Sequence, residues 1–502
     1  MTDFFKKNKG YLAYGFFFTL LAHLIKFVNY YPCWDSILGV KQTWSGMISF
    51  GRWFAGPAEI ILSSKYDLQW VVGVEAAFFI SITAVLVLEL FGVEDKFLRL
   101  VSISLFAVFP SFAATFMYGL WTPAYMLGLF FAALSVYLCV KRPGIGVMVA
   151  ACVMMTLSLA IYQIYFLFGA VMVAYYIAKE LMAGDFDFKS IKKIIVRFVI
   201  LTVASFAGYA IIGKVLRTVG GYGLSNYQGI STAGRMSVGD IVSGIKKMIN
   251  STGSFFLGAK YVTFYGILNV VILILLAVLL ISVVWTDKEN TVLRKIIVTV
   301  LYGSVIPITY VFYLASPGVI YHRLMQLSLY FVYFLGILLI SKDCGKYLKK
   351  RVPMALMGLI CLLTFYHFIN DNTAYHQASI SYEKSYFEIT ELMGKIDAVN
   401  TQGTKKLCII GGFNFGEDNY IVTVPDITGA ETDNMFHYPE HIFAFAKYYM
   451  DRDYVPCSEG DRAKVLEAID IDKMSAFPYG ECVTVVDDII VVKLPARTQQ
   501  NN

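Results

Sequence analysis

Residues 69–91 read QWVVGVEAAFFISITAVLVLELF, a stretch that is apolar over nearly its whole length. A segment needs about 20 such residues to cross the hydrocarbon core of a bilayer as a helix. Similar runs recur along the chain, and we predict eleven membrane spans, at residues 11–30, 69–91, 99–116, 121–140, 145–161, 164–182, 197–215, 265–285, 296–315, 325–341 and 354–370. The sequence therefore predicts an α-helical, polytopic membrane protein.

The composition of the chain supports the same fold class. Of its 502 residues, 57% are hydrophobic and 16% are charged, and the mean hydropathy is +0.62, well above that of soluble proteins. The first run does not resemble a cleaved signal peptide, because it contains His23 and Lys26 and lacks a small-x-small cleavage pattern. The net charge of +6 needs no nucleic-acid partner, since the basic residues lie beside the spans, where membrane lipids with anionic headgroups attract them.

Lysine and arginine are concentrated in one set of the loops between the predicted spans. Cytoplasmic loops carry such an excess, so we predict that the N-terminus is cytoplasmic. With an odd number of spans, the chain after about residue 371 then lies outside the cytoplasm. The chain is thus predicted to divide into a transmembrane domain, residues 1–370, and an extracytoplasmic domain, residues 371–502.

Residues 371–502 have the polar, mixed-charge composition of a small α/β domain, with strands predicted at 406–410, 482–486 and 488–493 and helices at 381–399, 439–449 and 461–470. Two outer segments of the transmembrane domain, 31–68 and 215–264, are too long to be plain connectors, which makes them candidates for function. Within the first, residues 41–62 are typical of an interfacial helix with a break at Gly56-Pro57. Within the second, a short helix is predicted at 238–249.

The first outer segment begins with Tyr31-Pro-Cys-Trp34-Asp35, which places an acid just after the first span. Asp35 could be a solvated loop acid or a helix cap. Alternatively, Trp34 and the apolar residues that follow could desolvate the carboxylate and raise its pKa towards the working range of a general base. Such a base takes the proton from a hydroxyl group that attacks an electrophilic carbon.

Three cationic side chains are expected near the outer ends of spans, namely Lys26, Arg52 and Arg323. Each could contact lipid headgroups, and Lys26 could extend its ammonium from the first span to the interface. The functional interpretation is an anion site, in which arginine holds a phosphate bidentately. His322, next to Arg323, is a polar neighbour that could line the same site or serve structure alone.

Aromatic and polar residues at the same face could bind sugar hydroxyls. The candidates are Trp34, Trp44, Glu75, Tyr162, Gln163 and Tyr165. Tyr162-Gln163-Ile-Tyr165 forms a very short predicted turn, and Trp121 and Tyr125 lie on the neighbouring turn. The alternative is an aromatic belt at the membrane interface. Glu75 lies inside a span, where an acid needs a buried partner or a polar cavity.

Neither a metal ion nor another cofactor is expected from the cysteine and histidine pattern, which contains no Cys-x-x-Cys pair and no Cys/His cluster. Two Asp-x-Asp strings, at 185–187 and 451–453, have no surrounding motif that would support a metal site. A disulfide between Cys457 and Cys482 is left open, because only the geometry of the folded chain decides it.

Taken together, these motifs resemble the bacterial membrane glucosyltransferases with a type II glucosyltransferase domain, which modify O-antigen and related surface polysaccharides and belong to the GT-C superfamily. The matching features are Asp35 after the first span, Gly51-Arg52-Trp53, Tyr162-Gln163-Ile-Tyr165, His322-Arg323, and in the tail Met474-Ser-Ala-Phe-Pro-Tyr-Gly480 and Val491-Val-Lys493-Leu494. The resemblance implies that Asp35 is the general base and that Arg52 and Arg323 bind the phosphate of a lipid donor.

The resemblance also implies the reaction and its partners. A hexose, with glucose as the expected sugar, would move from a polyprenyl-phosphate donor in the outer leaflet of the bacterial inner (plasma) membrane to a surface glycan acceptor. A donor-synthesising glycosyltransferase and a flippase would supply that donor. One departure is that many GT-C enzymes have paired acids in the first loop, whereas Cys33-Trp-Asp35-Ser36 has one. This leaves the metal requirement open, and also whether Glu59 or Glu75 supplies a second carboxylate.

Three other functions fit parts of the pattern. A polysaccharide polymerase or ligase would share the outer-face chemistry. A transporter or flippase of lipid-linked sugars would need polar residues along a path through the membrane midplane, whereas most predicted spans are apolar at their centres. A sensor with an outer binding domain is disfavoured, because the candidate residues gather in the membrane loops. The donor sugar, the acceptor and the linkage lie beyond the sequence.

Overall fold

The fold was examined in a computed structural model of the whole chain. It describes residues 2–39, 44–62, 68–182, 188–232, 234–258, 263–287, 290–316, 318–341, 351–413, 427, 429–430, 434–436 and 438–495. The side chains of two predicted site residues, Trp34 and Asp35, and the string at 185–187 lie outside this described part.

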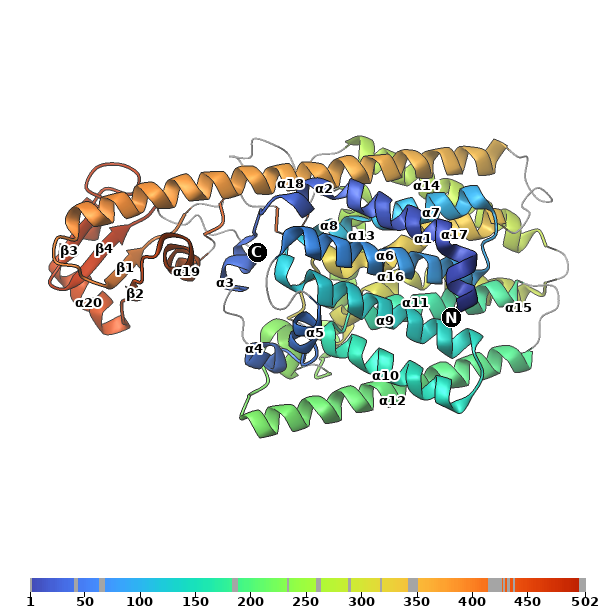
Figure 1. The fold of residues 1–502 in the computed structure, drawn as a ribbon. Coiled ribbons are helices and arrows are strands. Elements are labelled where there is room, and N and C mark those ends of the chain that lie inside the picture. Colours follow the sequence, from blue (N-terminus) through green and yellow to red (C-terminus); the bar gives the residue numbers. More distant parts are fainter. Residues whose placement is uncertain are drawn as a thin grey trace. The chain divides into compact units, whose positions relative to one another are not determined.

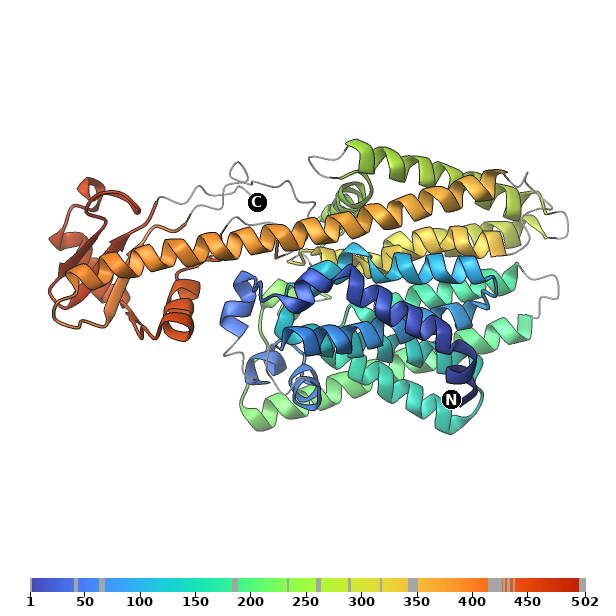
Figure 2. The ribbon, with the colours of Figure 1, turned by 45° about the horizontal axis from the view of Figure 1, so that its top comes forward.

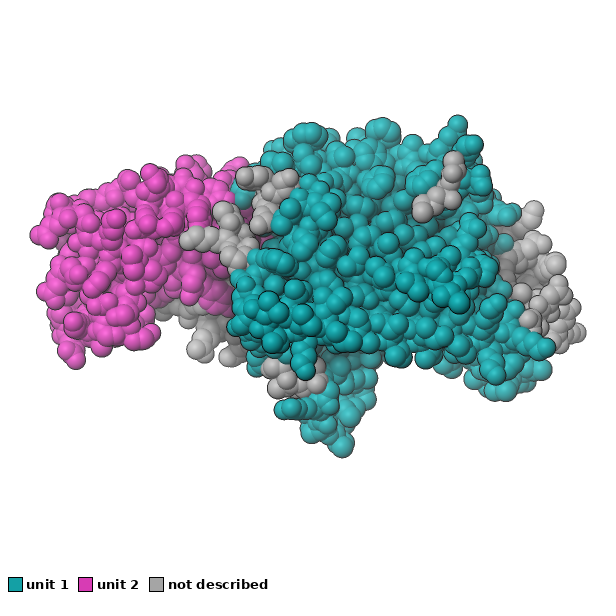
Figure 3. All heavy atoms as spheres, turned by 60° about the horizontal axis from the view of Figure 1, so that its bottom comes forward, with its two compact units in different colours: residues 1–30, 43–372, 425–428 teal, residues 31–42, 373–424, 429–502 magenta. Residues whose placement is uncertain are grey.

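The chain forms two compact units (Figure 3). The first comprises residues 1–30, 43–372 and 425–428, and the second comprises residues 31–42, 373–424 and 429–502. The long helix α18, Arg351–Val399, contributes its first part to the first unit and its remainder to the second. Residues 31–42, which begin the first outer segment, are therefore assigned to the same unit as the tail.

The first unit is a bundle of helices (Figures 1 and 2). Besides the first part of α18, its helical elements are α1 Thr2–Ala22, α2 Leu24–Val28, α4 Trp44–Ser49, α5 Ala55–Ile61, α6 Gln69–Phe91, α7 Lys96–Ala107, α8 Pro110–Phe116, η1 Gly119–Trp121, α9 Thr122–Lys141, α10 Ile145–Ile161, α11 Tyr165–Leu181, α12 Phe188–Gly220, η2 Tyr227–Thr232, α13 Val238–Leu257, α14 Thr263–Leu280, the π-helix η3 Ile281–Trp285, α15 Val292–Gly303, α16 Val305–Thr309, η4 Val311–Leu314, η5 Arg323–Leu329 and α17 Tyr330–Ser341.

Helix covers most of each predicted span. In the described part of the chain, eight helices are long and apolar enough to cross a membrane, and α10 is a shorter apolar helix. The chain is therefore a mostly helical protein with the features of a membrane protein, and the count of eleven spans stays a prediction. One predicted span, 99–116, is interrupted between α7 and α8 at Pro110, which has no N–H to continue the first helix and begins the second.

The amphipathic segment 41–62 is helical, as predicted, but its break lies elsewhere. Gly51, with φ +73°, separates α4 from α5, a backbone conformation that glycine adopts at little cost. The predicted break at Gly56-Pro57 was wrong, because Pro57 lies in the first turn of α5, where the missing N–H has no helical partner to lose. The predicted helix at 238–249 is present and extends further, as α13.

Helix α9 is central in the bundle and packs against α5, α6, α10 and α11. Close packing with α10 is possible because Gly128 has no side chain, and a Cβ there would lie 3.1 Å from Ile161. The Ser158 hydroxyl donates to the Gly128 carbonyl at 2.7 Å across the same contact. Helices α4 and α5 lie at the end of this bundle opposite the N-terminus (Figures 1 and 2).

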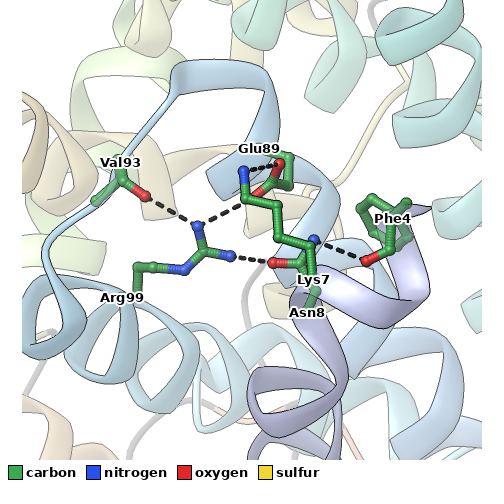
Figure 4. A network of polar contacts seen from close by, with 6 residues as sticks. All are labelled: Phe4, Lys7, Asn8, Glu89, Val93 and Arg99. Carbon is green, nitrogen blue, oxygen red and sulfur yellow. Dashed lines mark hydrogen bonds and ion pairs between the residues drawn. The ribbon is translucent and has the colours of Figure 1, made fainter.

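A network of polar contacts near the N-terminus joins α1, α6 and α7 (Figure 4). The buried Arg99 guanidinium donates to Glu89 Oε1 at 2.9 Å, to the Val93 carbonyl at 3.0 Å and to Asn8 Oδ1 at 2.6 Å. Lys7 Nζ binds the other oxygen of Glu89 at 2.9 Å, but the Lys7 side chain is 65% exposed. The network therefore depends mainly on Arg99, which satisfies three acceptors at once.

Arg99→Met is expected to lower the free energy of unfolding by about 3–5 kcal/mol, because it leaves Oε1 of the half-buried Glu89 and Oδ1 of the buried Asn8 without the Arg99 donor. Lys7→Met is the matched control and should cost about 0–1 kcal/mol, as for other exposed ion pairs. Thermal unfolding of both purified variants in detergent measures the difference. Equal losses for the two variants would contradict this account of the network.

The second unit contains a four-stranded sheet of order β2-β1-β4-β3. Its strands are β1 Lys406–Ile410, β2 Val455–Pro456, β3 Val483–Val486 and β4 Ile489–Lys493, and its other helical elements are α3 Trp34–Gly39, α19 Pro439–Met450, α20 Glu459–Ala468 and η8 Ile471–Lys473. Strand β1 is parallel to β2 and β4, and β3 and β4 form an antiparallel hairpin, with Asp487 at φ +53° in its turn. The predicted strands thus coincide with β1, β3 and β4.

Helix α3 packs against α19 within this unit. Ile37 is fully buried in the same core as Leu392, Ile442 and Phe445, so a residue from the start of the chain completes the core of the tail. Cys482 belongs to this core as well, whereas Cys457 packs with Cys408 in the core on the other face of the sheet. Both Cys457 and Cys482 are free thiols, so the disulfide between them is not formed.

Candidate functional site

The Gly51-Arg52-Trp53 turn is held by α4, which precedes it, and by two distant helices, α10 and α12. Arg52 N donates to the Met47 carbonyl at 2.8 Å, which closes the turn after α4. The Trp53 indole donates to the Tyr209 carbonyl on α12 at 3.3 Å, and Phe54 N donates to the Ala160 carbonyl on α10 at 2.9 Å. The start of α5 is therefore held against α10 and α12, which sets the direction of the Arg52 side chain.

The half-buried Arg52 guanidinium lies among tyrosines. It donates from Nη1 to the Tyr125 hydroxyl at 3.1 Å, and its Cζ lies 4.7 Å from the ring centroid of Tyr162. The rings of Tyr125 and Tyr162 stack at 5.1 Å. Burial opposes the charge, but the surrounding tyrosines, Tyr125 first and then Tyr162, Tyr227 and Tyr118, raise the pKa of Arg52 on balance, so the guanidinium stays charged.

The rest of the Tyr162–Tyr165 turn braces this arrangement. Gln163 Nε2 donates to the Tyr209 hydroxyl at 2.9 Å and to the Gly51 carbonyl at 3.4 Å, which ties the turn to the Gly51-Arg52 segment. Tyr165 is buried behind Tyr162, with the two rings edge to face at 5.5 Å. We name this set, Arg52, Tyr118, Tyr125, Tyr162, Gln163, Tyr209 and Tyr227, the Arg52 cluster.

A second cationic group lies at the start of η5. The buried Arg323 donates from Nη1 to Gln326 Oε1 at 3.1 Å, and its Cζ lies 4.9 Å from the ring of Phe255. Its backbone carbonyl accepts from the Ser111 hydroxyl at 2.8 Å. Arg323 also acts electrostatically on His367 and on Tyr265. We name the set of Arg323, Gln326, Phe255, Tyr265 and His367 the Arg323 cluster.

A group of three tyrosines packs together just before Arg323 in the chain. The ring centroids of Tyr313 and Tyr321 are 4.6 Å apart, and Tyr310 contacts both. Burial raises the pKa of Tyr321, and its neighbours Tyr313 and Tyr162 raise it further, so the hydroxyl stays neutral. Tyr321 thus lies within electrostatic reach of the Arg52 cluster while it precedes Arg323 by two residues. Charged guanidinium groups and neutral hydroxyl donors are groups that can bind a sugar phosphate.

The structure places the other predicted site residues as follows. Lys26 is buried in α2, and Glu75 is half-buried on α6. Trp44 is 45% exposed and donates its indole N–H to the Trp53 carbonyl at 2.8 Å, so it supports the turn. His322 is half-buried before Arg323, and its carbonyl accepts from Met325 N. Asp35 belongs to α3 of the second unit, and its side chain lies outside the described part.

Glu59, one of the two acids considered as a second carboxylate, is engaged elsewhere. Its Oε1 accepts from the backbone N–H of Ala124 at 2.9 Å, in the first turn of α9. This contact satisfies one of the N–H groups that a helix start leaves without a partner. Among the described residues, no group of three histidine, cysteine or acidic side chains is arranged to hold a metal ion.

The two tail motifs meet in the second unit. Lys493 Nζ on β4 donates to the carbonyls of Ile471 at 2.6 Å and Met474 at 2.7 Å, and Phe477 N donates to the Lys493 carbonyl at 2.9 Å. The segment 474–480 is thereby attached along the strand that carries Lys493. Within these contacts, Lys493 has the role of a structural anchor.

Sequence reasoning did not identify several residues of the two clusters, namely Tyr118, Tyr209, Tyr227, Tyr265, Gln326 and His367. Each lies in an apolar run or in the second outer segment, and no motif distinguishes it. The one sequence signal that could have indicated them is a polar residue near the end of an apolar run, because membrane spans tolerate polar residues where these line a cavity.

Comparison with known proteins supports one family. A family model described as Glucosyl transferase GtrII matches residues 24–341, a region that includes Lys26, Asp35 and both arginines of the clusters. None of the curated proteins and none of the solved structures gives a match. The family match confirms the resemblance inferred from the sequence. With more than half of its length matched by this model, the chain belongs to the GtrII glucosyl transferase family.

Proposed function

We propose that this membrane glucosyltransferase moves glucose from a polyprenyl-phosphate donor to a surface glycan acceptor outside the cytoplasm. Membership of the glucosyl transferase family supports glucosyl transfer. The long apolar helices support a donor that resides in the membrane. A lipid-linked donor brings a phosphate and a sugar to the end of the helical bundle, where both must be bound by protein groups.

The observation that carries the proposal is the environment of Arg52. Its guanidinium has five N–H donors, of which one is used by the Tyr125 hydroxyl. Among the described residues, its other neighbours are tyrosines and no carboxylate forms an ion pair with it. A half-buried cation without an anionic protein partner is suited to an anionic ligand, and arginine binds phosphate bidentately.

The proposed reaction is a single displacement at the anomeric carbon. The acceptor hydroxyl loses its proton to a general base, for which Asp35 is the candidate, and its oxygen bonds to the anomeric carbon. The bond from that carbon to the phosphate oxygen breaks, and polyprenyl phosphate leaves with the electron pair. Arg52 and Arg323 would stabilise the negative charge that grows on the leaving phosphate. Tyr125, Tyr162 and Gln163 would orient the sugar by hydrogen bonds and ring contacts.

The test is a transfer assay with the purified protein in lipid nanodiscs. Radiolabelled polyprenyl-phosphate glucose is incubated with candidate surface glycans, and polyprenyl-phosphate hexoses with other sugars and a nucleotide-linked glucose are run in parallel. We expect label in the glycan from the polyprenyl donor and none from the nucleotide donor. Transfer from the nucleotide sugar would contradict the proposed donor. Formation of long repeating products would favour a polymerase.

The orientation follows from the same proposal and can be tested separately. We expect a reporter fused after residue 371 to be active only outside the cytoplasm, and one fused at Lys141 to be active only inside, because basic loops stay cytoplasmic. Paired fusions of a periplasmic and a cytoplasmic reporter at each point measure this. A cytoplasmic signal after residue 371 would mean an even number of spans and would place the acceptor-facing residues on the wrong side.

A further inference from the structure

Asp371 on α18 is an unusual acid within the first unit. Its side chain is fully buried, and neither carboxylate oxygen has a hydrogen-bond partner in the described part of the chain. Burying a carboxyl group without a partner costs free energy, whether the group is charged or protonated. Acids of this kind persist where a ligand or a reaction needs them.

Two other acids of the unit, the half-buried Glu89 and the buried Glu59, show the contacts that a structural acid makes. Glu89 binds Arg99 and Lys7, and Glu59 accepts the backbone N–H of Ala124. Each of these carboxylates accepts at least one hydrogen bond from a protein donor, which offsets part of its desolvation. Asp371 has no such donor among the described residues, whereas Nδ2 of its neighbour Asn372 donates to the Ala22 and Phe368 carbonyls at 2.9 and 2.8 Å.

Helical spacing places Asp371 beside the Arg323 cluster. His367 precedes it by four residues, so the two side chains lie on the same face of α18. His367 is also fully buried, with Nδ1 unpartnered and Nε2 3.5 Å from the Tyr265 hydroxyl. Among the described residues, this face of α18 therefore carries a carboxyl group and one imidazole nitrogen without hydrogen-bond partners, and Arg323 acts electrostatically on the imidazole.

We propose that Asp371 binds the hydroxyl groups of the sugar on the lipid donor, while the adjacent Arg323 binds the donor's phosphate. The proposal rests on the proposed function and adds a sugar-binding residue to it. Four residues of helix advance by about 6 Å, so a carboxyl one turn beyond His367 can reach the sugar ring attached to a phosphate at Arg323. A carboxyl group can accept hydrogen bonds from two neighbouring hydroxyls at once, which a hexose presents and an apolar chain does not.

The test combines stability without substrate and donor kinetics for Asp371→Leu and Asp371→Asn. Leucine removes the buried acid, so the melting temperature of the ligand-free protein should rise by about 2–4 °C. The donor KM should rise at least tenfold with a smaller change in kcat, and Asp371→Asn should fall between leucine and wild type. Glu89→Gln is the control, a half-buried acid with protein partners, and should lower the melting temperature without changing the donor KM.

Deoxy-sugar donors supply the readout that a structural role would not change. Wild type should prefer polyprenyl-phosphate glucose over its deoxy analogues about tenfold at the recognised hydroxyls, and Asp371→Leu should lose most of that preference. A lower melting temperature for Asp371→Leu, or an unchanged donor KM and preference, would overturn the inference. If wild type itself transfers no sugar from a polyprenyl phosphate, the proposed function fails first.

Discussion

Asp35→Asn is expected to abolish sugar transfer while the protein still folds and inserts into the membrane. The amide cannot accept a proton from the acceptor hydroxyl, and loss of a general base typically costs about 10²–10⁴ in rate. Folding should survive, because α3 is held in the second unit by Ile37, two residues further along. The measurement is kcat at saturating donor and acceptor for purified wild type and variant, with the donor KM as a second readout.

Two further variants sharpen the test of Asp35. Asp35→Glu keeps a carboxylate and should recover part of the activity, which a purely structural position would not show. Asp240→Asn is the control, because Asp240 is an exposed acid that caps α13 and belongs to neither cluster. Turnover of Asp35→Asn within threefold of wild type would remove Asp35 from the mechanism, and a defect of equal size in Asp240→Asn would point to lost expression or folding.

The sequence predicted those parts of the fold that depend on local patterns. Apolar runs of bilayer length correspond to helices, since a membrane span is recognised by the length and polarity of one segment. The strands at β1, β3 and β4 were recognised for the same reason, because short β-branched stretches and the turn at Asp487 are local signals. The family resemblance depended on short motifs in the same way, and the family match confirms it.

The sequence could not predict contacts between residues far apart in the chain. Trp53 meets Tyr209 across 156 residues, and the hydroxyl of that tyrosine then binds Gln163. Nothing in the apolar sequence of α12 indicates that Tyr209 contacts both Trp53 and Gln163. The assignment of α3 to the unit of the tail is another such contact, since a six-residue helix has too little pattern of its own. The sequence places Asp371 directly after the last predicted span, and only its burial in the folded chain makes it a candidate for binding the donor sugar.

Arg52→Ala is expected to weaken donor binding by about 2–4 kcal/mol, or about 30- to 1,000-fold, because a phosphate bound there would lose a charged, partly buried donor. Arg52→Lys keeps the charge but loses the planar fork and the contact with the Tyr162 ring, so its donor KM should lie between wild type and alanine. Donor-concentration kinetics at equal protein levels measure both. Arg235→Ala, an exposed arginine in the second outer segment, is the control.

Variants of Arg323 test whether the two clusters bind the same phosphate group. Arg323→Ala and Arg323→Lys should also raise the donor KM, with a smaller effect on the acceptor, and their melting temperatures must be checked because Arg323 is buried against Gln326 and Phe255. If both guanidiniums contact the same phosphate, the losses in Arg52→Ala and Arg323→Ala will not add, and the double variant will depart from their sum by more than about 0.5 kcal/mol. Additive losses would place the two arginines on different parts of the donor. If Arg323→Lys and Arg323→Ala both match wild type, Arg323 only anchors η5, and the phosphate is held by the Arg52 cluster alone.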